Sequence, residues 1–396
     1  MPLNTSHDPL RSSDFNDGLE RLFPPSRLPS IHRAWAHQLL ESAHRSVAEL
    51  SLLEKASDGV YPHLNTSASL KKLRVNLESK PQSSFKPTFA FRIPRASLTL
   101  ADADPIRSAG FHDQGGTQLN VVVEWIDYNI DAVDERFVHL RRLDDLARVM
   151  HSASDQHPDL HTVDCLGYTD DTKESRYGLI YKAPATSNCT LNQIISSPDL
   201  KTPDLDERVR LAQTLAVALW SLHSLDWLHK SLCSNNILFF PSPLSTGTRP
   251  VATVADISSP VLAGFDGSRP DLDTDMSLTS KKSPSSAESL HRHPGSLHPS
   301  RRRPYCKGYD IYSLGLVLLE IGLWKVLQTY HRPQYSAERW RDKVVLAVLV
   351  PGLGSKVGRL YRGVVEKCLT VDEDISSQEA SQFMESIVAT LEGIRI

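Results

Sequence analysis

The sequence predicts an α+β fold, with strands in the N-terminal half of the chain and long helices in the C-terminal half. Three stretches carry this prediction. Leu119–Tyr128 (LNVVVEWIDY) is rich in β-branched residues and indicates a buried strand. Asp206–Leu225 repeats its apolar residues with a helical period, and Ile311–Leu327 is the most apolar run of the chain. Glu320 interrupts that run, which indicates a buried helix rather than a membrane span.

The composition is that of an ordinary soluble protein. The 396 residues are 40% hydrophobic and 23% charged, and the net charge is -3. This balance predicts no general attraction to nucleic acid or to anionic membranes. We expect no transmembrane segment, because the most apolar run is interrupted, and we expect protein partners. Five cysteines without a C-x-x-C pair fit reduced thiols in an intracellular protein. We expect the cytoplasm, with the nucleus as the alternative because of the run SRRRP at 300–304.

Residues 1–84 are predicted to form a partly disordered region with one or two helices. Residues 1 to 30 are polar and lack a period, which is typical of disorder. Apolar residues at steps of three and four predict a helix over Ile31–Leu53, and a second, shorter helix follows at Ala68–Glu78. We interpret the basic residues of the second helix as a solvated face, and a lipid or nucleic-acid contact is the weaker alternative. These residues are Lys71, Lys72 and Arg74.

Residues 85–184 are predicted to be rich in strands. The glycines Gly110, Gly115 and Gly116 have the wrong spacing for a phosphate-binding loop and indicate a plain hairpin connection. Lys182–Asn188 would then be a hinge to the helical part. The predicted elements are strands at Thr88–Ile93, Ala96–Leu100 and Leu119–Tyr128, a helix at Glu135–Met150, and a hairpin of Val163–Tyr168 with Arg176–Tyr181.

Residues 185–396 are predicted to be mainly helical. Residues 267–304 are rich in Ser, Pro, His and Arg and predict a long flexible segment. Ser283-Pro284 is a candidate phosphorylation site, and an unregulated insertion is the alternative. The other predicted elements are helices at Thr190–Ile195, Asp206–Leu225, Tyr361–Leu369 and Gln378–Leu391, a strand at Ile237–Phe240, a hairpin of Val251–Ile257 with Val261–Phe265, and a linker at Pro351–Gly354.

The stretch LHKSLCSNNILFF has the layout of the catalytic loop of a phosphoryl-transfer enzyme, H-R-D-L-x-x-x-N. Aligning His229 and Asn236 with this pattern places Lys230 at the Arg and Ser231 at the Asp. The Asp accepts the proton of the attacking hydroxyl group, and a serine hydroxyl is not basic enough to replace it. Asn236 would hold a metal ion in an active enzyme. Its alternative role, which we favour, is a hydrogen bond to the loop backbone.

The remaining positions that would handle charge are also replaced. Glu124 lies where a lysine would bind the phosphates, and a carboxylate there repels them. In LAGFDGSR, Gly264 takes the place of the metal-binding Asp of a D-F-G motif, and Asp266 follows two residues later as a displaced candidate. Arg141 or Arg142 is the basic candidate near this site, with a charged outer helix face as the alternative.

Three further acids are of interest. Asp310 begins the apolar run and is either a helix cap alone or also an acceptor for the backbone of the catalytic loop. Asp226 and Asp256 are the acids nearest the loop that could replace the lost base. Both are more simply explained as loop or hairpin residues.

Taken in order, five motifs give the chain its resemblance to the eukaryotic protein-kinase-like fold over residues 85–396. They are VVVEWIDY, HTVDCLGYTDD with RYGLIY, LHKSLCSNNILFF, LAGFDGSR and YDIYSLGLVLLEIGLW. The chain resembles most closely the fungal kinase-like proteins that often carry a helical domain of the HeLo type. The resemblance implies a bilobal fold, with an N-lobe at 85–184, a C-lobe at 185–396 and an N-terminal helical extension. It also implies a part in fungal non-self recognition or cell-death signalling.

Because the base, the lysine and the metal-binding Asp are all replaced, the leading hypothesis is a pseudokinase that acts as a binding or signalling scaffold. The alternative is an active, atypical protein Ser/Thr kinase that binds ATP and Mg²⁺. In that case Glu124, Asn236, Gly264 and Asp266 would line the cofactor site, with Asn236 and Asp266 as the metal ligands. A third hypothesis is an α+β interaction protein unrelated to kinases.

Overall fold

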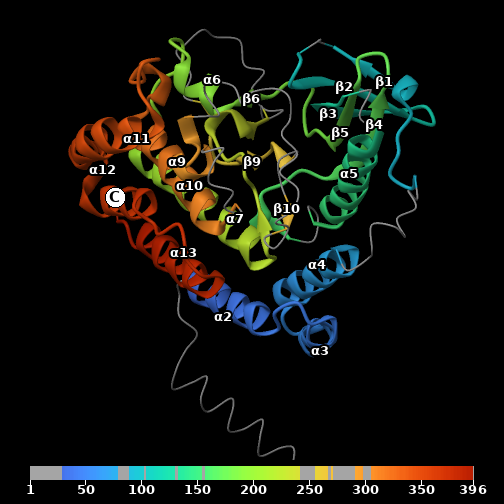
Figure 1. Cartoon of the computed structure of the whole chain (residues 1–396), viewed down its shortest axis with the longest axis horizontal. Coiled ribbons are helices and arrows are strands. Elements are labelled where there is room, and N and C mark those ends of the chain that lie inside the picture. Colours follow the sequence, from blue (N-terminus) through green and yellow to red (C-terminus); the bar gives the residue numbers. More distant parts are fainter. Residues whose placement is uncertain are drawn as a thin grey trace, which may run out of the picture.

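The computed structural model describes residues 29–78, 89–101, 104–129, 133–153, 157–240, 255–265, 269–270, 290–297 and 305–395. The α+β prediction is confirmed, because an antiparallel sheet forms in the N-terminal half and helices fill the C-terminal half (Figure 1). The five strands lie in the order β1-β2-β3-β5-β4. They are β1 (Leu98–Leu100), β2 (Arg107–Gln114), β3 (Thr117–Asp127), β4 (Cys165–Asp171) and β5 (Arg176–Lys182).

The hairpin of β2 and β3 was only partly predicted. Gly115 and Gly116 form its turn, as expected, with φ of 62° and 95°. Gly110, predicted to lie in the same loop, instead lies within β2, where it pairs with Leu100 of β1. A Cβ at Gly110 would lie 2.9 Å from the Leu100 Cα, so the two strands approach too closely for a side chain. The strand escaped prediction because RSAGFHDQ has no apolar alternation.

The rest of the sheet follows the predicted pattern more closely. Val121, Val122 and Val123 of β3 are all buried, as the β-branched run indicated. Helix α5 (Val133–Ala153) covers β4, and β4 pairs with β5 as the predicted hairpin. The strand predicted at Thr88–Ile93 is absent from residues 89–93, which hold only an isolated bridge between Arg92 and Tyr168, and residue 88 lies outside the described part.

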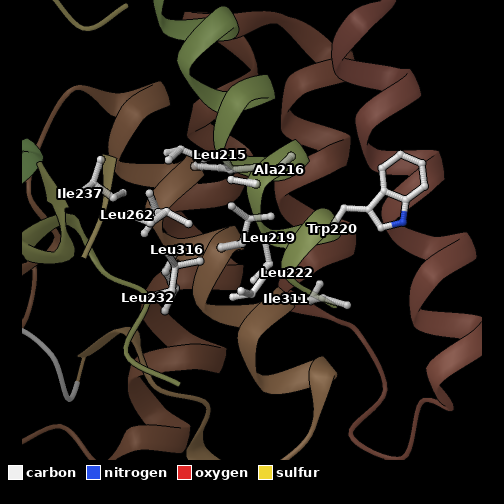
Figure 2. Packing of buried hydrophobic residues seen from close by; sticks show 14 of the residues in the cluster. Leu215, Ala216, Leu219, Trp220, Leu222, Leu232, Ile237, Leu262, Ile311 and Leu316 are labelled. Carbon is white, nitrogen blue, oxygen red and sulfur yellow. The ribbon is translucent and has the colours of Figure 1, made fainter. Parts of the chain in front are cut away.

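The helical half surrounds two long helices, α7 (Leu205–Ser224) and α10 (Lys307–Leu323). Figure 2 shows Leu215, Leu219 and Leu222 of α7 in one apolar cluster with Ile311 and Leu316 of α10. The short strands β8 (Ile237–Phe239) and β9 (Val261–Leu262) add Ile237 and Leu262 to this cluster. Burial of such a cluster stabilises the fold by roughly 1.5–3 kcal/mol for each large side chain. Helix α6 (Leu191–Ser196) and the two-residue strand β6 (Cys189–Thr190) precede α7, and α13 (Ser377–Glu392) closes the chain.

The linker predicted at Pro351–Gly354 is wrong. These residues lie at the start of α12 (Val350–Leu369), which directly continues α11 (Ala337–Arg339) and a π-helical stretch, Trp340–Leu349. Pro351 removes one backbone N–H donor within this continuous stretch, and it lies where the π-helical turns end and α12 begins. The helix bends at Gly358 instead, where φ is 83°. Among the described residues, Ala337–Leu369 is the one helical stretch long and apolar enough to cross a membrane, which alone is weak evidence for a span.

Two predictions for the region after β8 also need correction. Residues 255–257 form no strand, and β9 pairs with β8 rather than with Val251–Ile257, whose first four residues lie outside the described part. Within the segment predicted to be flexible, β10 (Arg269–Pro270) pairs with β7 (Trp227–Leu228), and residues 290–297 pack against the body and contain α9 (Pro294–Leu297). His291 is buried there and bonds Glu320 at 3.1 Å. Ser283-Pro284 lies outside the described residues.

Three helices precede the sheet and lie along one edge of the molecule (Figure 1). They are α2 (Pro29–Ser42), α3 (Val47–Ser57) and α4 (Pro62–Glu78), so the single helix predicted at Ile31–Leu53 is in fact two. The break falls at His44, whose φ is 46°, and Ser46 then caps α3 by accepting a hydrogen bond from the Glu49 N–H. Of residues 1 to 30, predicted to be disordered, 1–28 lie outside the described part, and residues 29 and 30 begin α2.

The solvated basic face predicted on α4 is also wrong. Lys71 is 1% exposed and Arg74 is 2% exposed, whereas Lys72 lies nearer the surface in an ion pair with Glu54. Lys71 and Arg74 both contact the segment that follows α7. A sequence pattern of charges could not show this, because it depends on how α4 packs against residues 150 positions away.

Candidate functional site

The loop His229–Asn236 lies at the junction of the sheet and the helices, and Asp310 of α10 holds it from one side. The two Asp310 carboxylate oxygens accept hydrogen bonds from the backbone N–H groups of His229 and Lys230, each at 2.8 Å. His223 bonds the same carboxylate at 3.2 Å. Asp310 lies one turn inside α10, so it is not the helix cap, and contact with the loop backbone is the role that the structure gives it.

The charge of Asp310 is stabilised despite its complete burial. Burial alone would raise the pKa of this carboxyl group. The hydrogen bond and charge of His223, followed by the charge of His229 and the backbone N–H of Lys230, instead hold the pKa below its ordinary value of 3.8. The Tyr305 hydroxyl also donates to Asp310 at 2.9 Å. Asp310 therefore stays ionised and fixes the loop backbone near neutral pH.

Asn236, at the end of the loop, bonds the loop itself. Its side-chain amide donates to the Ser231 carbonyl oxygen at 2.7 Å, and this is the structural role favoured from the sequence. Its backbone carbonyl accepts a hydrogen bond from the Ala263 N–H at 2.9 Å. Its remaining side-chain oxygen, the atom that would bind a metal ion, accepts a hydrogen bond from Arg107.

Arg107 is the central residue of the site. It lies on β2 directly opposite Glu124 of β3, and its Nε lies 2.6 Å from the Glu124 Oε1. Its other guanidinium nitrogens reach across to the loop, where one donates to the Asn235 carbonyl oxygen at 2.7 Å and the other to the Asn236 side chain. A planar guanidinium group with several fixed donors suits such a bridge. One side chain thus joins the sheet to the helical half.

The Glu124 carboxylate is buried, and it forms an ion pair with Arg107 and accepts hydrogen bonds from Gly264. The backbone N–H of Gly264 donates to both Glu124 oxygens, at 2.8 and 3.1 Å. Gly264 has a φ of 82°, and a Cβ built on it would lie 2.5 Å from the Asn236 Cγ. An aspartate at this position would therefore collide with Asn236. The ring of the next residue, Phe265, lies 4.9 Å from the ring of His229.

The segments that the sequence predicted to meet do meet. Glu124, Asn236 and Gly264 lie in one site, together with the loop that contains His229 and Ser231. Asp266 lies outside the described residues, so its place is not part of this geometry. The stretch that ends at Phe265 lies beside His229–Asn236, and separation of these two segments would have favoured the third hypothesis.

The described residues do not fit a complex of Mg²⁺ with ATP. Magnesium needs several oxygen ligands held in an octahedron. The side-chain oxygen of Asn236 accepts from Arg107, and the Glu124 carboxylate accepts from Arg107 and Gly264. Within the described part of the chain, no group of three or more His, Cys, Asp or Glu residues could hold a metal ion. The positive charge of Arg107, which by itself would attract phosphate, is balanced by the Glu124 carboxylate beside it.

The other acids and bases considered from the sequence lie elsewhere. Asp226 forms an ion pair with Lys71 at 3.2 Å, and Asp256 accepts hydrogen bonds from Ser258 in its own turn. Arg141 pairs with Asp145 along α5 at 3.7 Å, which agrees with the interpretation as a charged helix face. The side chain of Arg142 lies outside the description. None of these contacts supplies a base beside Ser231.

Arg107 was missed from the sequence, although a signal for it exists. A two-residue turn at Gly115-Gly116 pairs residues 114 and 117, so partners across the hairpin have numbers that sum to 231. The partner of Glu124 is then residue 107, an arginine. Opposite charges directly across two antiparallel strands are a favourable pair. Recognition of β2 as a strand would have been enough to find it.

Comparison with known proteins identifies the family of the chain, but it assigns no activity to that family. A search of curated proteins finds no match. The model of a domain of unknown function, DUF7580, matches residues 123–391, which contain α7, α10 and every described residue of the site except Arg107. Because this match covers more than half of the 396 residues, the protein belongs to the DUF7580 family.

Proposed function

We propose that this protein is a pseudokinase: a two-lobed, kinase-like scaffold that binds protein partners and does not transfer phosphate. The observation that carries the proposal is the position of Arg107. Its guanidinium group lies among the three residues that correspond to the phosphate-binding lysine, the metal-binding asparagine and the metal-binding aspartate of a kinase, namely Glu124, Asn236 and Gly264.

The hydrogen bonds of the site support a stabilising rather than a catalytic role. Each polar group that a kinase would direct at ATP and Mg²⁺ is directed here at another part of the chain. Such a network holds two halves of a molecule in one arrangement, and partly buried charge pairs of this kind confer specificity of structure. A fixed arrangement of the two halves is what a binding scaffold requires.

The loop itself offers no substitute base. Ser231 occupies the place of the kinase aspartate, and a serine hydroxyl does not accept a proton at neutral pH without a base beside it. His229 is buried, and burial lowers the pKa of its imidazole despite the nearby acids Asp310 and Glu124. It packs against Phe265 as a structural residue. Loss of the base together with the metal site leaves little catalytic power beyond positioning.

Partners and location follow from the same proposal. A kinase-like scaffold acts through its surface, so its partners are proteins, in the cytoplasm or the nucleus, and include fungal signalling proteins if the resemblance to fungal kinase-like proteins holds. The N-terminal helices α2–α4 add a further surface next to α13 and α7.

The test is ligand-dependent thermal stability of the full chain. Millimolar ATP with and without MgCl₂ should leave the melting temperature unchanged, because a ligand that does not bind the native state cannot stabilise it. The matched control is Asp266→Ala under the same conditions. A magnesium-dependent rise in melting temperature that disappears in this variant would contradict the proposal and favour the atypical kinase.

A second experiment tests transfer directly. Purified protein incubated with γ-labelled ATP, Mg²⁺ and a general acceptor protein should transfer no label above the background of a Ser231→Ala variant. Label transfer by the wild type that is lost in Asp266→Ala would show an active enzyme.

A further inference from the structure

The N-terminal helices form a small unit with a core of their own. Leu40, Leu50, Ala68 and their neighbours pack together, separately from the main core. Only a few apolar residues, Ala34, Leu70 and Leu77 among them, join the main core from these helices. A unit that closes its own core and makes few apolar contacts with the rest of a chain can separate from it at a modest cost in free energy.

Charged groups make the main polar contacts between this unit and the body. Lys71 pairs with Asp226, and Arg74 donates to the Leu225 carbonyl oxygen. On α2, Arg33 bonds the Asp159 carboxylate at 2.8 Å. Leu225 and Asp226 lie just before β7 and the candidate loop His229–Asn236, so α4 contacts the stretch that leads into that loop.

Two buried histidines lie in the same interface. The ring of His37 packs edge-on against Trp220 of α7, with centroids 4.5 Å apart, and His37 is 4% exposed. His157, equally buried, lies with its Nε2 2.7 Å from the Ser67 hydroxyl of α4. In the part of the chain that the structure describes, neither Nδ1 atom has a hydrogen-bond partner. A neutral imidazole tolerates that environment far better than a charged one.

The charges around these rings do not compensate for a proton. His37 faces Asp159 and three bases, namely His157, Arg33 and Lys307. His157 faces Asp159, together with Arg33 and His63. Asp159 is the only acid in either set, and it already forms the ion pair with Arg33. Mainly because of burial, the pKa of His37 is lowered to about 3 and that of His157 to about 4.

We propose that α2–α4 form a releasable cap on the body, docked when His37 and His157 are neutral and released when these two histidines take up protons. This inference concerns the interface between α2–α4 and the body, and it does not depend on the proposed function. Release would expose Trp220 and free Asp226 from Lys71, in the stretch that precedes the loop carrying Asn236.

The direction of the pH dependence of docking, and the pH range in which it acts, follow from the two histidines. Their pKa is lower in the docked state than the ordinary 6.5 of an exposed histidine, so the released state binds more protons. Docking is therefore strongest above pH 6.5 and weakens as the pH falls toward about 4. For each pH unit by which the pH falls in this range, each histidine lowers the equilibrium constant for docking by up to about tenfold. The two histidines together lower it by up to about 100-fold per pH unit.

Amide hydrogen exchange of the full chain at pH 7.5 and 5.5 tests the proposal, after correction for the intrinsic exchange rate. We expect protection of α2 and α4 to fall at least tenfold at pH 5.5, while protection of α10 stays constant. Unchanged protection of α2 and α4 would overturn the proposal. An equal fall in α10 would also overturn it, because the whole protein would then be unfolding.

A variant with His37→Gln and His157→Gln removes the two groups that take up protons and keeps polar side chains of similar length at both positions. It should protect α2 and α4 equally at the two pH values. The matched control is His331→Gln, because His331 packs against Tyr335 and Trp340, away from α2–α4, and its pKa is also lowered by burial. That control should keep the wild-type pH response. A double variant that folds and still releases α2–α4 at pH 5.5 would overturn the proposal. If the double variant does not fold, the comparison of α2 and α4 with α10 in the wild type at the two pH values decides the question.

Discussion

Gly264 and Asn236 lie so close together that a Cβ on Gly264 would be 2.5 Å from the Asn236 Cγ. The N–H of Gly264 points at Glu124, and the Asn236 side chain bonds both Arg107 and the loop carbonyl of Ser231. The site is therefore too closely packed to hold an aspartate side chain at residue 264.

Gly264→Ala should destabilise the protein more than Gly358→Ala. Both glycines have φ near 83°, and an alanine at either position costs about 1–3 kcal/mol in backbone strain. Gly358 has open space around it, whereas alanine at 264 must also displace Asn236, which adds about 1–3 kcal/mol. Urea unfolding of the two variants measures the difference. Equal losses would show that Asn236 moves aside easily.

Arg107→Met should lower the free energy of unfolding by about 3–5 kcal/mol, because it leaves the buried Glu124 carboxylate without its partner. The double variant Arg107→Met, Glu124→Gln should recover part of that loss, since no buried charge then remains. Chemical denaturation of both single variants and the double variant gives the coupling between the residues. A coupling near zero would mean that the ion pair does not hold the two halves together.

Guanidinium ion at low, non-denaturing concentration should partly restore the stability of an Arg107→Gly variant. The variant leaves a space that is lined by the Glu124 carboxylate and the oxygens of Asn235 and Asn236. A small planar cation with the same donors can enter that space, and it stabilises only the native state. Thermal melts with guanidinium chloride and sodium chloride at equal ionic strength make the comparison. Equal effects of the two salts would argue against a built cation site.

Asp310→Asn should destabilise the protein by about 3 kcal/mol at pH 7, because the carboxylate accepts hydrogen bonds from His229 and Lys230 in a fully buried place. The folded pKa of Asp310 lies below its ordinary 3.8, so its contribution is present above pH 4 and is lost as the pH falls through the folded value. The difference between variant and wild type in the free energy of unfolding, measured with urea, should therefore become smaller below pH 4. The exposed Asp256→Asn serves as the control and should leave stability at pH 7 nearly unchanged.

Asp226→Asn should cost more stability than Lys71→Met. Without the Asp226 carboxylate, Lys71 and Lys307 remain close together and lose the acid that pairs with both of them. Without the Lys71 ammonium group, Asp226 still has Lys307 at 3.8 Å, and methionine fills most of the space. Lys72→Met on the same helix is the control, because its ion pair with Glu54 is partly exposed and contributes little. Equal losses for Asp226→Asn and Lys71→Met would contradict this account.

The strands and helices predicted best are those with strong local patterns. The β-branched run of β3 and the apolar periods of α7 and α10 were found to within four residues of their ends, since burial of these faces dominates their energetics. The strand β2 and the division between α2 and α3 were missed. A polar strand is held by its neighbours in the sheet, and the turn at His44 is held by a capping serine, so neither leaves an apolar period in the sequence.

The sequence by itself predicted the strand and loop segments that carry Glu124, Ser231 and Gly264, because each lies in a stretch with a recognisable local pattern. Only the tertiary structure decided what these residues contact. The bridge from Arg107 to Asn236 spans more than 120 residues of chain, and the pairing of Lys71 with Asp226 spans more than 150. Such partners are chosen by strand register and by the packing of helices from distant parts of the chain, and a local pattern of residues contains neither.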